Sequence, residues 1–259
     1  MNINRKTTIS EGGKVANTNR QTAIKESKMK ITASNLIRWS GLAAMGAGII
    51  FIAIQPIHPL DILSSVTTST WAVIQSLKFT MALLGLLGIA GLYARQVEKA
   101  GWLGLAGYLL FSLFYALTAA FVFAEAFILP LLATEAPQFV EGFLGIFNGS
   151  PSDINLGALP GLYTLTGFAG YLLGGLLFGI ATFRAGILPR WAGGLLAFGV
   201  VLPVLTSSLL SHPLDRILAA PLGLALAWLG YALWSERREP ASQPLPVLES
   251  PLPSQTRAA

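Results

Sequence analysis

Long apolar segments alternate with short polar connections along most of this chain. Each segment, with its flanking residues, reaches the roughly 20 helical residues that cross a hydrocarbon core about 30 Å thick. The pattern therefore predicts six membrane spans: Trp39 to Ile57, Trp71 to Ala94, Gly101 to Leu132, Leu159 to Phe183, Trp191 to Ser211 and Ile217 to Trp234.

Helices are expected for these spans rather than barrel strands. A barrel strand alternates apolar and polar residues over segments of about ten, whereas Met81 to Ala90 and Tyr108 to Phe123 are largely apolar on every face. Inside hydrocarbon a helix also satisfies its backbone hydrogen bonds within one segment. We therefore predict an all-α fold, a polytopic transmembrane helical bundle.

Composition agrees with a membrane protein. Hydrophobic residues make up 53% of the 259 residues and charged residues 11%, which is more apolar surface than a soluble domain of this size can bury. The chain contains no cysteine, so disulfides, thiolate chemistry and cysteine-ligated metals are excluded.

Positive charge marks one side of the predicted bundle. All but two of the 17 lysines and arginines lie in the two tails and in the second and fourth connections: Arg5, Lys6, Lys14, Arg20, Lys25, Lys28, Lys30, Arg38, Arg95, Lys99, Arg184, Arg190, Arg237, Arg238 and Arg257. The first connection (Pro59 to Thr70) and the third (Ala133 to Ala158) carry only acidic charges. Because short cationic loops stay in the cytoplasm, we predict that both termini are cytoplasmic. The two exceptions are Lys78 and Arg216.

The chain divides into three parts on this reasoning. Residues 1–35 are expected to form a flexible basic tail, 36–235 the six-helix transmembrane domain, and 236–259 a disordered tail rich in proline and serine. The net charge of +5 does not indicate nucleic-acid binding, because the cations are spread over four segments without a binding motif. The expected partner is the lipid bilayer, and a protein partner or a homo-oligomer stays open.

One internal repeat and a set of regularly spaced glycines suggest how the spans are organised. Arg38-Trp39-Ser40-Gly41 is followed by His58-Pro59-Leu60-Asp61, just as Arg190-Trp191-Ala192-Gly193 is followed by His212-Pro213-Leu214-Asp215, which predicts a parallel repeat of helical hairpins, spans one and two matching spans five and six. Glycines at helical spacing let two backbones approach closely. The candidate packing glycines are Gly85, Gly88, Gly91, Gly101, Gly104, Gly107, Gly170 and Gly174. Packing within the bundle explains them better than a dimer motif.

A polar cluster is expected near the outer ends of spans two and three. If Trp71 anchors span two at the interface, Lys78 lies about 10 Å deep at 1.5 Å per residue, and Glu125 lies roughly 8 Å before Pro130 on the antiparallel span. An acid and a base at one depth are natural partners, and Gln75 lies one turn from Lys78. The cluster is either part of a proton or substrate path or a structural ion pair.

The paired His-Pro-Leu-Asp elements allow a second hypothesis. His58, Asp61, His212 and Asp215 could chelate a divalent metal, and the two histidines alone could ligate a haem. Proline after a helix and aspartate before one are, however, ordinary boundary residues, so capping and chain reversal explain these elements better. No cofactor is therefore predicted.

The third connection carries an amphipathic stretch. Its apolar side chains fall close to one helical face, with Glu141 elsewhere: Phe139, Phe143, Leu144, Ile146 and Phe147. Such an element is expected on the outer membrane surface, where it can cover the bundle, bind a partner or guard a cavity.

No catalytic signature is present, so an enzyme is not expected. Between Leu36 and Trp234 the chain resembles a family of bacterial multi-pass membrane proteins with no assigned activity, through His58-Pro59, Gly91-Leu92-Tyr93-Ala94-Arg95-Gln96, Glu125-Ala126-Phe127-Ile128-Leu129-Pro130 and Phe183-Arg184-Ala185-Gly186-Ile187-Leu188-Pro189-Arg190-Trp191-Ala192. The resemblance implies a bacterial plasma membrane. Three function classes remain: a non-enzymatic scaffold or sensor-type subunit, a small transporter or channel, and a membrane metal or haem protein. The first requires the fewest features, because it needs only the helical bundle and an exposed loop or tail.

Overall fold

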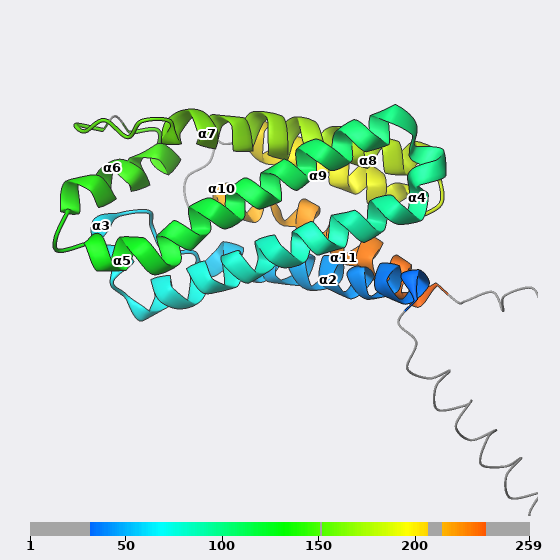
Figure 1. Ribbon diagram of the computed structural model, residues 1–259, viewed down its shortest axis with the longest axis horizontal. Helices are drawn as coiled ribbons and strands as arrows, with labels where there is room; N and C mark the ends of the chain where they lie inside the picture. The colour runs from blue at the N-terminus through cyan, green and yellow to red at the C-terminus, as the bar shows by residue number, and fades with distance from the viewer. Residues whose placement is uncertain (1–31, 151, 207–213, 237–259) are drawn as a thin grey trace, which may run out of the picture.

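The computed structural model describes residues 32–150, 152–206 and 214–236, and within these ranges it contains helices and no strand. Figure 1 shows an elongated bundle. In chain order the elements are α2 (Ala33–Ile54), η1 (Gln55–Ile57), α3 (Leu63–Val66), α4 (Ser69–Phe123), η2 (Ala124–Ile128), α5 (Leu129–Leu132), α6 (Pro137–Asn148), α7 (Leu159–Leu165), η3 (Thr166–Gly174), α8 (Gly175–Ala185), α9 (Arg190–Thr206), α10 (Leu214–Ile217) and α11 (Ala220–Ser235).

The longest element, α4, is a hairpin of two antiparallel arms. Gly101 interrupts it with φ 59° and ψ −163°, a backbone conformation that only glycine adopts without strain. The rings of Tyr93 and Tyr108 stack at 4.6 Å across the turn, and those of Phe79 and Phe123 lie 5.8 Å apart further along. Figure 1 shows the chain running along the bundle in cyan, turning, and returning in green.

Close backbone contacts close the helices into a ring. Contacts link α11 to α2, α2 to α4, α4 to α8 and η3, α8 to α9, and α9 to α11. Glycines lie at these seams: a Cβ on Gly88 would be 2.6 Å from the Cα of Ala44 in α2, and one on Gly174 would be 2.5 Å from the amide nitrogen of Phe111. A side chain there would separate the two backbones.

The predicted packing glycines divide into two groups. Gly85 faces the Tyr115 ring, and the other seam glycines each meet a neighbouring segment: Gly88 and Gly91 meet α2, Gly107 meets α8, Gly170 and Gly174 meet the second arm of α4, and Gly104 meets Ala100 beside the turn. Gly101 is different, because a Cβ there would have no neighbour within 4 Å. The interpretation of Gly101 as a packing residue is therefore wrong, and its positive φ shows that it reverses the chain instead.

The two ends of the bundle differ in charge. At one end, here called the basic end, Arg38 Nε donates to the carbonyl of Trp234 at 2.6 Å, and Arg95 Nε lies 2.6 Å from Glu236 Oε2. In Figure 1 the turn between the two arms of α4 lies at this same end, where α2 begins and α11 ends. The opposite end, called the cavity end, carries α3, α5 and α6, and α10 lies between it and the middle of the bundle, in contact with η1.

The outer surface suits a lipid environment. Three helical stretches are long and apolar enough to cross a membrane, Ala33–Ile57, Ser69–Leu132 and Leu159–Ala185, and α9 and α11 are shorter apolar helices. Trp102 and Trp191 are 85% and 74% exposed beside the basic end, where interfacial tryptophans are expected. Trp71 is fully buried, so its interpretation as an interface anchor is wrong.

Several boundaries differ from those predicted. Thr32 caps α2 by accepting a hydrogen bond from the Asn35 amide, so this helix begins six residues before Trp39. Residues 33–35, predicted to end the flexible tail, therefore belong to α2. Most of both predicted tails, like His212 and Pro213 of the repeat, lies outside the described residues. The six spans and the hairpin repeat stay predictions.

Candidate functional site

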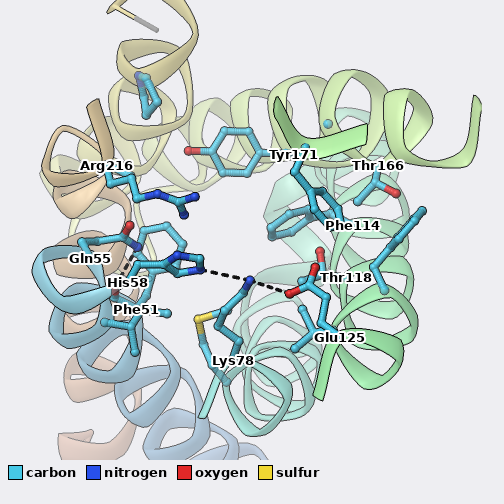
Figure 2. A pocket seen from close by; sticks show the side chains of 18 of the residues that line it. Phe51, Gln55, His58, Lys78, Phe114, Thr118, Glu125, Thr166, Tyr171 and Arg216 are labelled. Carbon is cyan, nitrogen blue, oxygen red and sulfur yellow. Dashed lines mark hydrogen bonds and ion pairs between the residues drawn. The ribbon is translucent and has the colours of Figure 1, made fainter. Parts of the chain in front are cut away.

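Toward the cavity end, a partly open cavity of about 430 Å³ lies in the middle of the helix ring. Side chains from α2 and η1, both arms of α4, η2, α6, α7, η3, α9 and α10 contribute to its wall. Charged and polar groups share this wall with aromatic rings (Figure 2). The cavity therefore has the mixed lining and the size that are typical of small-molecule sites.

Lys78 is the centre of a hydrogen-bonded chain that crosses the cavity. Its Nζ lies 2.9 Å from Glu125 Oε2 and 3.3 Å from His58 Nε2 (Figure 2). His58 Nδ1 is 2.7 Å from the carbonyl oxygen of Pro59, which can only accept. This geometry assigns the proton of a neutral His58 to Nδ1, so that Nε2 accepts from the Lys78 ammonium. The end of η1, where His58 lies, is thereby joined to α4 and η2 through one cation.

A second ion pair lines the same cavity. Arg216 Nη2, from α10, lies 2.8 Å from Asp61 Oδ2, from the first connection. The Asp61 side chain is 6% exposed, so its charge is compensated where water is scarce. The cavity therefore holds two cations and two carboxylates that are paired within the protein.

The backbone at Glu125 needs a partner from outside its own helix. Glu125 lies on the π-helical segment η2, where the Leu129 amide bonds to the carbonyl of Ala124, five residues back. In this register the donor to the Glu125 carbonyl would be residue 130, which is a proline and has no N–H. The indole Nε1 of the fully buried Trp71 donates to that carbonyl instead, at 2.9 Å.

Trp71→Phe is therefore expected to lower the free energy of unfolding by about 2 kcal/mol, because it leaves a buried carbonyl without a donor. Pro130→Ala restores a backbone N–H, so the same substitution should have a smaller effect in a Pro130→Ala background. Unfolding of the four proteins in mixed detergent micelles measures this coupling. Trp102→Phe is the control, since Trp102 is 85% exposed. Equal effects of Trp71→Phe in both backgrounds would contradict the assignment.

The amphipathic stretch of the third connection forms α6 and covers the cavity end. Phe143 and Leu144 are buried, the Phe143 ring lies 5.9 Å from that of Phe121, and Glu141 is exposed. Asn148 Nδ2 ties the end of α6 to the carbonyl of Asp61 at 2.8 Å. Phe147 reaches the cavity wall, so α6 contributes to the site as well as covering it.

Gln75 is not part of the hydrogen-bonded chain. Its side chain is fully buried, and neither its amide nitrogen nor its oxygen has a hydrogen-bond partner among the described residues. Gln75 is also absent from the wall of the cavity that holds Lys78 and Glu125. The interpretation that Gln75 joins their cluster is therefore wrong, because helical spacing places it one turn away but turns its amide elsewhere.

The predicted metal ligands are only partly described. Within the ranges 32–150, 152–206 and 214–236, no three histidine, aspartate or glutamate side chains lie close enough to hold a metal ion. His58 contacts Lys78 and Pro59, and Asp61 pairs with Arg216, so these two donors already have partners. His212 and the side chain of Asp215 lie outside the described structure.

No family model, curated protein or solved structure matches this chain. The resemblance to bacterial multi-pass membrane proteins stays a prediction.

Sequence reasoning did not place Arg216 in the site. The sequence does single out Arg216 by its position, because it is one of two cations outside the basic segments. A candidate partner could have been found in the first connection, whose only acid is Asp61. Uncharged members of the wall, including Tyr171 and Thr166 of η3, gave no signal, because an apolar run does not show which face of its helix meets a cavity. A further buried polar pair, Gln96 and Thr182 at 2.8 Å, lies away from this site.

Proposed function

We propose that this protein is an integral membrane protein of six spans in a bacterial plasma membrane, with both termini in the cytoplasm. In this arrangement the basic end faces the cytoplasm and the cavity end faces outward. The distribution of arginines and lysines over the tails and the second and fourth connections supports this orientation.

We further propose that the protein acts as a non-enzymatic, sensor-type subunit that binds a small molecule in the cavity. The observation that carries this proposal is the position of the cavity in the middle of the helix ring, with wall residues from α2, both arms of α4, α6, α7, η3, α9 and α10. A ligand that contacts several of these helices at once can change how they pack, and so alter the surface that a cytoplasmic partner binds. Two ion pairs in the wall, each with a buried carboxylate and a partly exposed cation, add polar groups that a lipid-facing bundle would otherwise avoid.

Transport is the second candidate. The observation in its favour is that both π-helical segments, η2 and η3, contribute side chains to the cavity, and that α9 carries Pro203 inside the helix at its wall. Such interruptions occur at functional sites and allow helices to bend. The glycine seams toward the basic end hold the backbones in close contact, which favours binding over passage.

The absence of cysteine permits a direct test, because one introduced cysteine is the only thiol in the protein. We expect a membrane-impermeant thiol reagent applied to intact cells to label Glu141→Cys but not Glu98→Cys, two exposed positions toward opposite ends of the bundle. Thr118→Cys, in the cavity wall, should react with a small charged reagent, whereas the fully buried Ala82→Cys should not. Labelling of Glu98→Cys in intact cells would overturn the orientation, and an inert Thr118→Cys would overturn the binding cavity.

A further inference from the structure

The two cations in the cavity wall are more exposed than their acidic partners. The Lys78 side chain is 18% exposed and that of Glu125 3%, while Arg216 is 29% exposed and Asp61 6%. In each pair the acid is therefore the buried member and the cation the accessible one. Figure 2 shows the Lys78 ammonium and the Arg216 guanidinium reaching toward the middle of the cavity from different elements.

Both cations keep donors that their described partners do not use. An ammonium has three N–H donors. Among the described residues, the acceptors for the Lys78 ammonium are Glu125 and His58. A guanidinium has five, and Arg216 gives one to Asp61 through Nη2. Because Lys78 and Arg216 both line the cavity, their remaining donors are available to a ligand that occupies it.

The rest of the wall is largely apolar. Its aliphatic and aromatic side chains come mainly from α2 and the two arms of α4, among them Phe51, Ile54, Met81, Phe114, Phe121 and Val122. A ligand that fills about 430 Å³ beside these residues needs an apolar body.

We propose that the cavity binds an anionic amphiphile, a molecule whose carboxylate or phosphate head contacts Lys78 and Arg216 and whose apolar body lies against Phe51, Ile54, Met81 and Phe114. This inference rests on the proposed binding function and names its ligand class. An organic cation is less suited to this wall, because the more exposed member of each ion pair is the cation, Lys78 or Arg216, and the carboxylates of Glu125 and Asp61 are 3% and 6% exposed. A neutral amphiphile would leave their spare donors without a charged acceptor.

The acids that hold the cations also compete with the ligand for them. Removing the charge of Asp61 frees the Arg216 guanidinium for the anionic head, so Asp61→Asn is expected to tighten binding. Removing the guanidinium as well, in Asp61→Asn/Arg216→Gln, should weaken binding without leaving an unpaired buried charge. A gain in affinity from Asp61→Asn cannot come from misfolding.

The test uses the full chain in nanodiscs of zwitterionic lipid, with radiolabelled decanoate as the probe and empty nanodiscs as the blank. We expect saturable binding, displaced by unlabelled decanoate and by decyl phosphate but not by decanol or decyltrimethylammonium at the same concentration. Charge-assisted hydrogen bonds of this kind correspond to about tenfold in affinity or more, so Asp61→Asn should tighten and the double variant weaken binding by about that factor. Arg95→Gln, which alters a pair at the basic end, should bind like the wild type.

The outcomes separate this inference from the proposed function. Preferential displacement by decyl phosphate indicates a phospholipid-type head, and preferential displacement by decanoate indicates a fatty-acid-type head; both support the proposal. Equal displacement by decyltrimethylammonium, or looser binding in Asp61→Asn, would overturn the anionic class and leave a binding cavity. If no probe binds above the blank and Thr118→Cys is also inert, the cavity itself is rejected.

Discussion

Lys78→Met is expected to lower the free energy of unfolding by about 3–5 kcal/mol, because it leaves the carboxylate of Glu125 buried without its cation. Glu125 is 3% exposed, and Lys78 is its only ion-pair partner among the described residues. The carboxylate must then take up a proton or draw water into the bundle, and either process opposes folding.

Replacing both partners removes most of this penalty. Lys78→Met/Glu125→Met leaves no uncompensated charge, so its stability should return to within about 1 kcal/mol of the wild type. Reversible unfolding in mixed detergent micelles, on the wild type and three variants, gives the coupling energy directly. Arg95→Met is the matched control, because Arg95 and Glu236 are 40% and 36% exposed and such pairs contribute about 0–1 kcal/mol. Additive effects of the two substitutions would show that the pair contributes nothing to the fold.

Gly101→Val is expected to destabilise the bundle by an amount toward the upper end of about 1–3 kcal/mol, through the backbone alone. At φ 59° and ψ −163° a β-branched residue is strained whatever space surrounds it, and a side chain here would meet no neighbour within 4 Å. The strain acts where the two arms of α4 reverse direction, so it also opposes their antiparallel pairing.

Two further substitutions separate backbone strain from other effects of replacing glycine. Gly161→Val, in α7, likewise adds a side chain with no neighbour within 4 Å but at a position without a positive φ, and should be tolerated. Gly149→Asn, at φ 69° and ψ 19° after α6, should also be tolerated, because asparagine adopts left-handed backbone readily. Thermal unfolding of the three purified variants distinguishes them. A Gly101→Val protein as stable as Gly161→Val would contradict the role assigned to Gly101.

Periodicity predicted the helical elements well and their ends less well. The predicted segment from Leu159 to Phe183 matches α7, η3 and α8 closely. An apolar run of this length favours a helix, because a helix satisfies its backbone hydrogen bonds within the segment. The start of α2 was missed because it is set by a local capping bond from Thr32, beyond the apolar run. Burial of Trp71 was missed because nothing in the sequence shows that the Glu125 carbonyl lacks a backbone donor.

The sequence by itself determined the helical class, the asymmetry of charge between the connections, and the pairing of Lys78 with Glu125, because helical rise fixes the depth of each residue along its own axis. Only the tertiary structure decided which faces meet. It brought His58, Asp61 and Arg216 to the same cavity and turned Gln75 away from it, since rotation of each helix about its axis is set by packing against its neighbours. The depth of a residue depends on its own helix alone, whereas the set of residues in the cavity wall depends on how all the helices of the ring pack together.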